Sequence, residues 1–205
     1  MRVARFLERT TAEGPGERTA IWVQGCTIRC AGCFNPHLFG VRGGTPADPA
    51  ELVARVLAAG TTGVTLLGGE PFEQAAGLAA VAAGVRQAGR SVMTFTGYEY
   101  AHLRELAAAG HDDVAALLDA TDLLVAGPFR QDLVDHERPW VGSVNQQFIR
   151  LSDRIEDLPI DVAVTPDRLE VTVSASGAVS VNGWADLDTL DALLAGLPAR
   201  RGRPA

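Results

Sequence analysis

The segment GVTLLGGEPFEQAAGLAAVAAGVRQAGRSVMTF, residues 63–95, decides the predicted fold. Residues 63–67 and 91–95 are short apolar runs of the kind that forms buried strands, and an alanine-rich stretch at residues 73–88, ended by Gly89, lies between them. A strand, a helix and a second strand in this order form a βαβ unit, whose strands run parallel in one sheet. The sequence therefore predicts an α/β protein.

The same alternation continues on both sides of this unit. Towards the N-terminus we predict a strand at residues 19–24 and a helix at residues 49–59, which Asp48 would cap. Towards the C-terminus we predict helices at 100–109 and 113–119 and strands at 122–126 and 147–151. A sheet built from such units is largely parallel and binds ligands at the carboxyl ends of its strands.

The last part of the chain has a different pattern. Residues 130–167 are loop-rich outside the strand near 147–151, and residues 168–173 and 178–182 flank a Ser-Ala-Ser-Gly turn that predicts a β-hairpin. A final helix is predicted at 187–197, and we expect residues 199–205 to be disordered. No repeat or linker divides the sequence, so we expect residues 1–205 to form a single domain.

Composition and charge exclude several classes of partner. The chain has 205 residues and a net charge of −7, and its arginines are scattered except in the tail, so we expect no nucleic-acid partner. No apolar run approaches the roughly 20 residues that a membrane span needs. The N-terminus lacks the pattern of a secretory signal. We therefore expect a cytoplasmic protein with no membrane partner.

The three cysteines of the chain all fall in one short loop, Cys26-Thr-Ile-Arg-Cys30-Ala-Gly-Cys33, just after a predicted strand. An odd, local set of cysteines does not build a disulfide framework, and soft thiolates select zinc or an iron–sulfur cluster. Three thiolates on a four-iron cluster would leave one iron open to a small chelating molecule.

Zinc is the alternative to the cluster. His37, four residues after Cys33, could complete a Cys₃His set. Zinc knuckles normally close within small domains, however, whereas this loop opens a predicted α/β domain. The sequence favours the iron–sulfur cluster and leaves zinc as the minority interpretation.

A glycine turn, Gly68-Gly69-Glu70-Pro71, follows the predicted strand at residues 63–67. Without a Cβ, its first two residues would let a ligand approach the backbone closely, and a cationic amino group could lie against the carbonyl groups or Glu70. Taken alone, the turn is also typical of an ordinary strand-to-helix connection with proline near the helix start. Together with the cysteine loop it indicates one site.

These two motifs resemble the radical S-adenosylmethionine superfamily, whose members join a CxxxCxxC loop to a GGE-type turn at the end of the next strand. The resemblance implies a partial (incomplete) β/α barrel of mostly parallel strands, here followed by the C-terminal β-hairpin and helix. It implies a [4Fe-4S] cluster and S-adenosyl-L-methionine as cofactors, used to generate a 5′-deoxyadenosyl radical. The cluster ligands would be Cys26, Cys30 and Cys33. The residues bordering the methionine amino group would be Gly68, Gly69 and Glu70.

More closely, the chain resembles the activating enzymes of anaerobic ribonucleotide reductase, which are glycyl-radical-enzyme activases. Residues 14–18, 25–35, 96–98 and 127–146 carry this resemblance, within a family-like core at residues 1–151. The aromatic residue follows the third cysteine, as Phe34, and Gly32 precedes it, as in those activases. The resemblance implies that Gly32 and Phe34 flank the adenine. It also implies that Thr94 and Thr96 line the ribose or the methionine.

The family suggests the partners as well. It implies hydrogen abstraction from a glycine of a glycyl radical enzyme, such as anaerobic ribonucleotide reductase, and a flavodoxin- or ferredoxin-like electron donor. Residues 152–205 match nothing that we can assign. This leaves a second function open, the radical modification of a small metabolite or a short peptide, in which the C-terminal segment would close the site.

Overall fold

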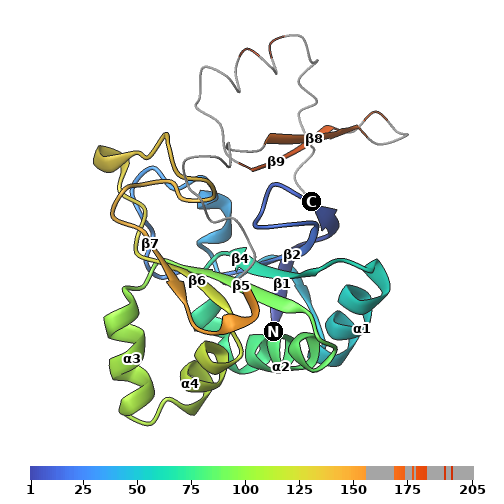
Figure 1. Cartoon of the computed structure of the whole chain (residues 1–205). Helices are drawn as coiled ribbons and strands as arrows, with labels where there is room; N and C mark the ends of the chain where they lie inside the picture. Colours follow the sequence, from blue (N-terminus) through green and yellow to red (C-terminus); the bar gives the residue numbers. More distant parts are fainter. Residues whose placement is uncertain (156–168, 174–176, 178, 184–191, 193–194, 196–205) are drawn as a thin grey trace.

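A computed structural model describes residues 1–155, 169–173, 177, 179–183, 192 and 195 of the chain. In these residues the central feature is a seven-stranded sheet with the strand order β3-β1-β2-β4-β5-β6-β7 (Figure 1). Its strands are β1 (Arg2–Thr10), β2 (Arg18–Val23), β3 (Thr45–Pro46), β4 (Gly63–Gly68), β5 (Ser91–Thr96), β6 (Leu123–Ala126) and β7 (Gln147–Arg150).

The middle of the sheet is parallel and its flanks are antiparallel. Strands β2, β4, β5 and β6 run parallel, whereas β1 and β7 pair antiparallel with β2 and β6. Val23 lies opposite Gly68, and Thr96 lies opposite Ala126, so the carboxyl ends of the parallel strands share one edge. The predicted α/β class is confirmed, with a mixed central sheet.

Helices pack on one face of this sheet (Figure 1). They are α1 (Pro49–Ala59), α2 (Ala75–Gln87), α3 (Tyr100–Ala108) and α4 (Asp112–Asp119). Val64 and Leu66 of β4 are fully buried in the same apolar cluster as Val56 and Leu78 of the covering helices. The predicted start of α1 is confirmed, because Asp48 Oδ1 accepts hydrogen bonds from two backbone N–H groups of the first turn. None of the helices in the described ranges combines the length and apolar character that crossing a membrane requires.

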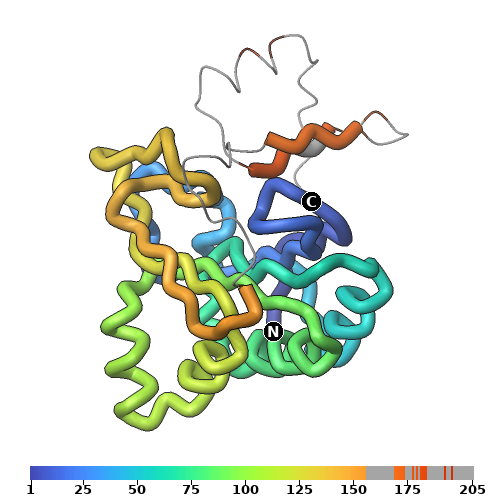
Figure 2. The backbone as a smooth tube through the Cα atoms, in the orientation of Figure 1, coloured from blue at the N-terminus to red at the C-terminus, as the bar shows by residue number. Residues whose placement is uncertain are grey.

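Loops cover the opposite face. Leu67 of β4 and Trp22 of β2 point to this side and pack with Leu38 from the segment after the cysteines. The tube in Figure 2 shows the segment at residues 127–146 running over the same side of the sheet. A functional site can therefore form on this face, between the strand ends and the loops.

Strand β1 was not predicted from the sequence. Its sequence, RVARFLERT, places apolar residues in adjacent pairs, so it lacks the alternation of apolar and polar residues that identifies a strand, and of its nine residues only Val3 and Thr10 are buried. Two of its half-buried side chains make cation–π contacts instead: the Arg5 guanidinium lies 4.9 Å from the centre of the Trp22 ring in β2, and the guanidinium of Arg55 lies 3.7 Å from the centre of the Phe6 ring.

The predicted helix at residues 73–88 begins differently in the structure. A 3₁₀ turn, η2 (Pro71–Gln74), precedes α2, and Glu70 caps this turn by accepting a hydrogen bond from Phe72 N–H. The prediction of a continuous helix was therefore wrong at its start, because the side chain of Glu70 and the ring of Pro71 favour the tighter turn.

A buried arginine joins the starts of three parallel strands. Arg18 is 1% exposed, and its guanidinium donates hydrogen bonds to Thr65 Oγ1 at 2.8 Å, to the Val64 carbonyl at 2.7 Å and to both oxygens of Ser91. Burial lowers the pKa of Arg18 to about 10. These bonds fix β2, β4 and β5 relative to one another at the end of the sheet away from the cysteines.

The predicted C-terminal hairpin is confirmed as β8 (Leu169–Val173) and β9 (Val179–Gly183), which pair antiparallel. It lies over the face of the sheet opposite the helices (Figure 1). The backbone N–H of Gly183 donates a hydrogen bond of 3.1 Å to Glu13 Oε1, in the segment before β2. The predicted helix at 187–197 and the predicted disordered tail at 199–205 lie outside the described residues.

Candidate metal centre

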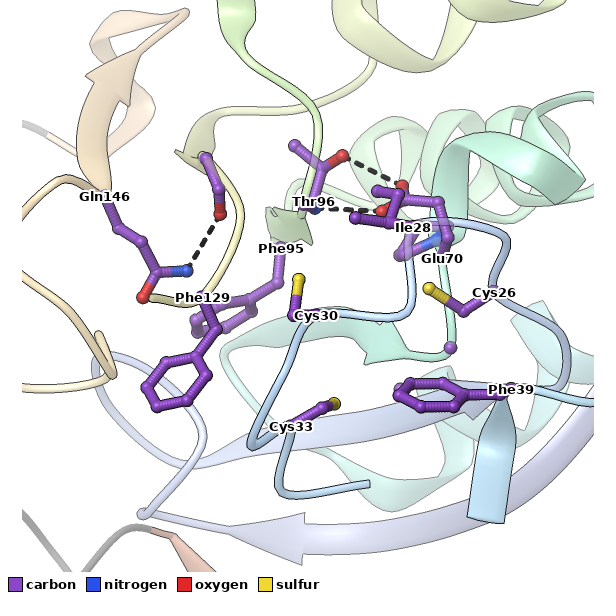
Figure 3. A pocket seen from close by; sticks show the side chains of 15 residues that line it. Cys26, Ile28, Cys30, Cys33, Phe39, Glu70, Phe95, Thr96, Phe129 and Gln146 are labelled. Atoms are coloured by element: carbon purple, nitrogen blue, oxygen red, sulfur yellow. Dashed lines mark hydrogen bonds between the residues drawn. The ribbon is translucent and has the colours of Figure 1, made fainter. Parts of the chain in front are cut away.

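The cysteine loop leaves the carboxyl end of β2 and places its three thiols around one cavity. Cys26, Cys30 and Cys33 are all partly buried and unpaired, and all three line a cavity of about 140 Å³. Figure 3 shows their sulfur atoms pointing into a common space. In the described part of the chain, no three His, Cys, Asp or Glu side chains form a set that could hold a single metal ion. Thiolates from three cysteines around one cavity are the ligands that hold an iron–sulfur cluster.

The protonation chemistry of the thiols fits a metal cluster as well. Burial raises the pKa of all three thiols above the usual value. A buried thiolate therefore needs a positive partner, and iron supplies one because metal binding displaces the thiol protons. The backbone N–H of Asn35 donates a hydrogen bond of 3.4 Å to Cys33 Sγ, which orients this sulfur and would stabilise its thiolate form.

The zinc interpretation needs His37 beside the cysteines. His37 lies in the 3₁₀ turn η1 (Pro36–Leu38), is exposed to solvent and does not line the cavity that the three cysteines share. A Cys₃His set is therefore not assembled in the structure.

The glycine turn is bonded directly to the start of the cysteine loop. Gly69 N–H donates to the Val23 carbonyl and Glu70 N–H to the Gly25 carbonyl, both at 2.8 Å. A Cβ on Gly69 would lie 2.1 Å from the Gly25 carbonyl oxygen, and a Cβ on Gly68 would lie 2.7 Å from Trp22 Cα. The sequence suggested that these glycines admit a ligand. The structure shows that they admit the neighbouring backbone, so the two motifs form one unit.

Glu70 lies at the centre of this unit. It is 1% exposed, and its carboxylate accepts hydrogen bonds of 2.9 Å from Phe72 N–H, Thr96 Oγ1 and Gly97 N–H. Two of these bonds are drawn in Figure 3. Burial raises the pKa of Glu70 to about 7, although the three donors act in the opposite direction. The carboxyl group joins the ends of β4 and β5 beneath the cavity.

The two threonines named from the family pattern have different surroundings. Thr96 lines the cysteine cavity, and its hydroxyl is engaged with Glu70. Thr94 is fully buried and exchanges a hydrogen bond of 2.9 Å with Thr121 Oγ1. The structure thus brings Thr96 to the cavity and does not bring Thr94 there.

Gly32 and Phe34 lie on the outer side of the cysteine loop. Phe34 is 49% exposed, its ring centre lies 5.4 Å from that of Phe129, and it lines a second, larger cavity beside the first. Gly32 has φ +73°, and a Cβ there would lie 2.7 Å from the side-chain oxygen of Gln131. Gly32 lines neither of these two cavities.

Several residues of the site were missed by the sequence reasoning. Glu73 accepts a hydrogen bond of 2.7 Å from Thr27 N–H and so anchors the cysteine loop to η2. Gln146 joins two loops, since its Oε1 accepts from Gly142 N–H at 2.8 Å and its Nε2 donates to the Gly127 carbonyl at 3.1 Å. Further lining residues of the cysteine cavity are Ile28, Phe39, Phe95 and Phe129. The only sequence signal among these was the Asn145-Gln146 pair, which the family pattern contains but to which no role could be given.

Comparison with known proteins agrees with this geometry. The profile of a family described as a 4Fe-4S single cluster domain matches residues 12–149. Anaerobic ribonucleoside-triphosphate reductase-activating proteins from Salmonella typhimurium and Vibrio cholerae are 30% and 31% identical to the chain, over 71% and 74% of its length and 96% and 99% of theirs. The chain belongs to the radical S-adenosylmethionine activating proteins of glycyl radical enzymes. A pyruvate formate-lyase-activating enzyme from Clostridium pasteurianum is also 30% identical, over 51% of the chain and 46% of that enzyme.

Membership of this family accounts for the two halves of the site together. The match spans the cysteine loop, the glycine turn and the loop that carries Gln146. The match to the family profile ends before the hairpin of β8 and β9. The profile therefore has no counterpart of this hairpin.

Proposed function

We propose that this activating protein cleaves S-adenosyl-L-methionine reductively and abstracts a hydrogen atom from a glycine of an anaerobic ribonucleotide reductase. One observation carries the proposal. The three thiols of the cysteine loop and the Gly68–Glu70 turn surround a single cavity, in a chain whose full-length relatives carry the name of reductase-activating proteins.

Cys26, Cys30 and Cys33 would hold a [4Fe-4S] cluster. When bound and reduced by an electron donor, the cluster would supply the one electron that cleaves a carbon–sulfur bond of S-adenosylmethionine, giving methionine and a 5′-deoxyadenosyl radical. Hydrogen transfer from the glycine Cα to that radical would give 5′-deoxyadenosine and leave the radical on the glycine. The protein's part is to bind, to orient and to exclude water.

The S-adenosylmethionine would lie across the ends of β4 and β5. Gly68 and Gly69 offer backbone atoms to its amino group, and Glu70 supplies negative charge beneath them. Thr96 would act by holding Glu70, because its hydroxyl is already donated to that carboxylate. Gly32 and Phe34 would flank the adenine. Thr94 would take no part in binding, because its hydroxyl exchanges a hydrogen bond with Thr121 Oγ1.

Apolar side chains would keep water from the radical. The wall of the cysteine cavity includes Ile28, Phe39, Phe95 and Phe129, and its apolar character would protect a reactive intermediate from side reactions. We further propose that the open mixed sheet serves as an incomplete barrel, whose inner face carries Trp22 and Leu67. A flavodoxin- or ferredoxin-like donor and a cytoplasmic setting complete the proposal, since an oxygen-sensitive cluster and free thiols need a reducing compartment.

The test is anaerobic reconstitution followed by reduction with dithionite in the presence of S-adenosylmethionine. We expect 5′-deoxyadenosine, and we expect a glycyl radical signal by electron paramagnetic resonance when the reductase encoded in the same genome is added. Iron and sulfide that bind without any 5′-deoxyadenosine forming would contradict the cleavage step. Cleavage without a glycyl radical would contradict the choice of substrate.

A second candidate is the modification of a small metabolite or a short peptide. It is favoured by residues 181–183 of the hairpin, which line the second cavity next to the cysteine loop and could close it around a small substrate. Absence of a gene for any glycyl radical enzyme from the genome would decide for this candidate. A reductase that gains its radical from the protein would decide against it.

A further inference from the structure

The second cavity lies between the sheet and the C-terminal hairpin and has a volume of about 490 Å³. Its size falls within the range of about 300–1,000 Å³ that is usual for ligand sites. Cys33 and Gly68 line both this cavity and the one among the cysteines, so the two spaces adjoin. Trp22 and Leu67 form part of its wall, and residues 181–183 of β9 lie across from them.

The hairpin contributes a buried amide group without a partner. Asn182 is 3% exposed and lines the second cavity, yet neither its side-chain nitrogen nor its side-chain oxygen has a hydrogen-bond partner among the described residues. Glu170 lies directly opposite Asn182 in the hairpin register, and its Oε2 is also buried and unpartnered there. Buried polar groups are normally paired, so an amide in a cavity wall with neither its nitrogen nor its oxygen paired points to a ligand in that cavity.

Glu13 completes the polar end of the cavity. Its Oε1 accepts the hydrogen bond from Gly183 N–H. Burial raises the pKa of Glu13 and the charge of Glu170 adds to this effect, while the Gly183 donor and Arg5 act against it. Because a carboxylate can accept about four hydrogen bonds and Gly183 N–H supplies one, Glu13 can accept further donors.

This set of groups matches the backbone of a peptide. A primary amide can donate to a peptide carbonyl and accept from a peptide N–H at once, and a carboxylate can accept a further N–H. An anionic ligand would meet the carboxylate of Glu13, with that of Glu170 next to Asn182 in the hairpin, against one guanidinium in the cavity wall, that of Arg5. A simple cation would leave the amide N–H groups of Asn182 unpaired. An extended peptide can pair with both Asn182 and Glu13, the two polar groups that line the cavity wall beside Gly183.

We propose that the second cavity binds the peptide segment that carries the target glycine, with Asn182 paired to its backbone and Glu13 accepting one further backbone N–H. This inference rests on the proposed function, in which the substrate is a glycine of a protein. It gives the hairpin a role as the element that positions the peptide beside Cys33.

The test uses the full chain, loaded with its cluster under anaerobic conditions, and a labelled synthetic peptide that copies the glycine loop of the reductase from the same genome. The main variant is Asn182→Leu, which keeps the size of the side chain and removes both hydrogen-bonding groups. The second is Glu13→Gln, which keeps an acceptor for Gly183. The control is Val173→Leu on β8, where the side chain is 65% exposed and lines neither cavity.

We expect Asn182→Leu to weaken peptide binding about tenfold, or about 1.4 kcal/mol. Its thermal stability should not fall, because the amide that it removes has no partner in the free protein. Glu13→Gln should weaken binding severalfold, and Val173→Leu should bind as the wild type does. A peptide methylated on its backbone nitrogens next to the glycine should bind weakly to the wild type. Its affinity for Asn182→Leu should be the same as its affinity for the wild type.

Two results would overturn the inference. One is equal peptide affinity in the wild type, Asn182→Leu and Glu13→Gln. The other is a clear loss of thermal stability in Asn182→Leu with unchanged affinity, which would show that the amide serves the fold. If the wild type activates the reductase and the variants keep its affinity, the inference fails while the proposed function stands. If the wild type forms no glycyl radical in any protein, both fail.

Discussion

Replacing Glu70 by glutamine should change how the stability of the protein depends on pH. The carboxylate is buried and accepts from Phe72 N–H, Thr96 Oγ1 and Gly97 N–H. Its Oε2 receives only the Gly97 donor, so a glutamine that keeps its oxygen at the other two donors must turn its NH₂ towards Gly97 N–H. The variant therefore removes one ionisable group and leaves one backbone donor unpaired.

The magnitude follows from the pKa of Glu70, which burial raises from 4.5 to about 7. At about 1.4 kcal/mol for each unit of pKa, this difference amounts to about 3 kcal/mol. Because the pKa is higher in the folded chain, the contribution to stability is fully present below pH 4.5. It is lost as the pH rises, and the loss is complete just above pH 7. In Glu70→Gln this loss is absent, and a constant cost of about 1–3 kcal/mol for the unpaired N–H takes its place.

Urea denaturation of the reduced, metal-free chain at a series of pH values measures this effect. Relative to Glu70→Gln, the free energy of unfolding of the wild type should fall by about 3 kcal/mol between the acid and the alkaline end of the range. The variant should be about 1–3 kcal/mol less stable than the wild type at low pH, and above neutrality it should be as stable as the wild type or up to about 2 kcal/mol more stable. Glu99→Gln, at an exposed position, should keep the wild-type slope. Parallel curves for the wild type and Glu70→Gln would refute the reasoning, because they would show that the three donors fully offset the burial of the charge.

Three further predictions concern the backbone unit, the ligands and the sheet. Gly69→Ala should lower the iron and sulfide content after reconstitution and cost about 1–3 kcal/mol in unfolding free energy, since its Cβ would lie 2.1 Å from the Gly25 carbonyl oxygen. Gly40→Ala, whose Cβ would come no closer than 3.9 Å to a neighbour, should behave as the wild type. Cys30→Ala should abolish 5′-deoxyadenosine formation, whereas His37→Ala should retain it; a wild type that binds zinc and forms no 5′-deoxyadenosine would restore the zinc interpretation. Arg18→Met should cost about 3 kcal/mol or more in urea denaturation, because several buried acceptors lose their donor, and a loss below 1 kcal/mol would contradict this.

The parallel part of the fold could be predicted from the sequence because its signals are local. The apolar runs of β4 and β5 are buried in the core, as such runs indicate, and α1 has a capping residue at the expected place. Strand β1 could not be predicted in this way. Arg5 and Phe6 are held by cation–π contacts with residues distant in sequence, which leave no periodic pattern. Its assignment needs the neighbouring strand β2 to be in place.

The same distinction separates the site residues that could be predicted from the sequence from those that could not. The cysteines and the glycine turn could be found because a short spacing in sequence fixes their chemistry. Glu73 and Gln146 could not, since each acts through hydrogen bonds to a backbone that the fold brings close from elsewhere in the chain. Asn182 belongs to the same class. Only its burial without a partner marks it, and burial is a property of the folded molecule.

Backbone hydrogen bonds fix the position of the glycine turn relative to the cysteine loop. Gly69 and Glu70 donate their N–H groups to carbonyls at the start of the cysteine loop, and this contact is close enough to exclude a Cβ at Gly69. The end of β4 therefore fixes the position of Cys26 without using any side chain. The carboxylate of Glu70 then extends the same unit to Gly97 at the end of β5. A thiol-bound cluster and a molecule lying on the strand ends would thus be held in one frame, as electron transfer between them requires.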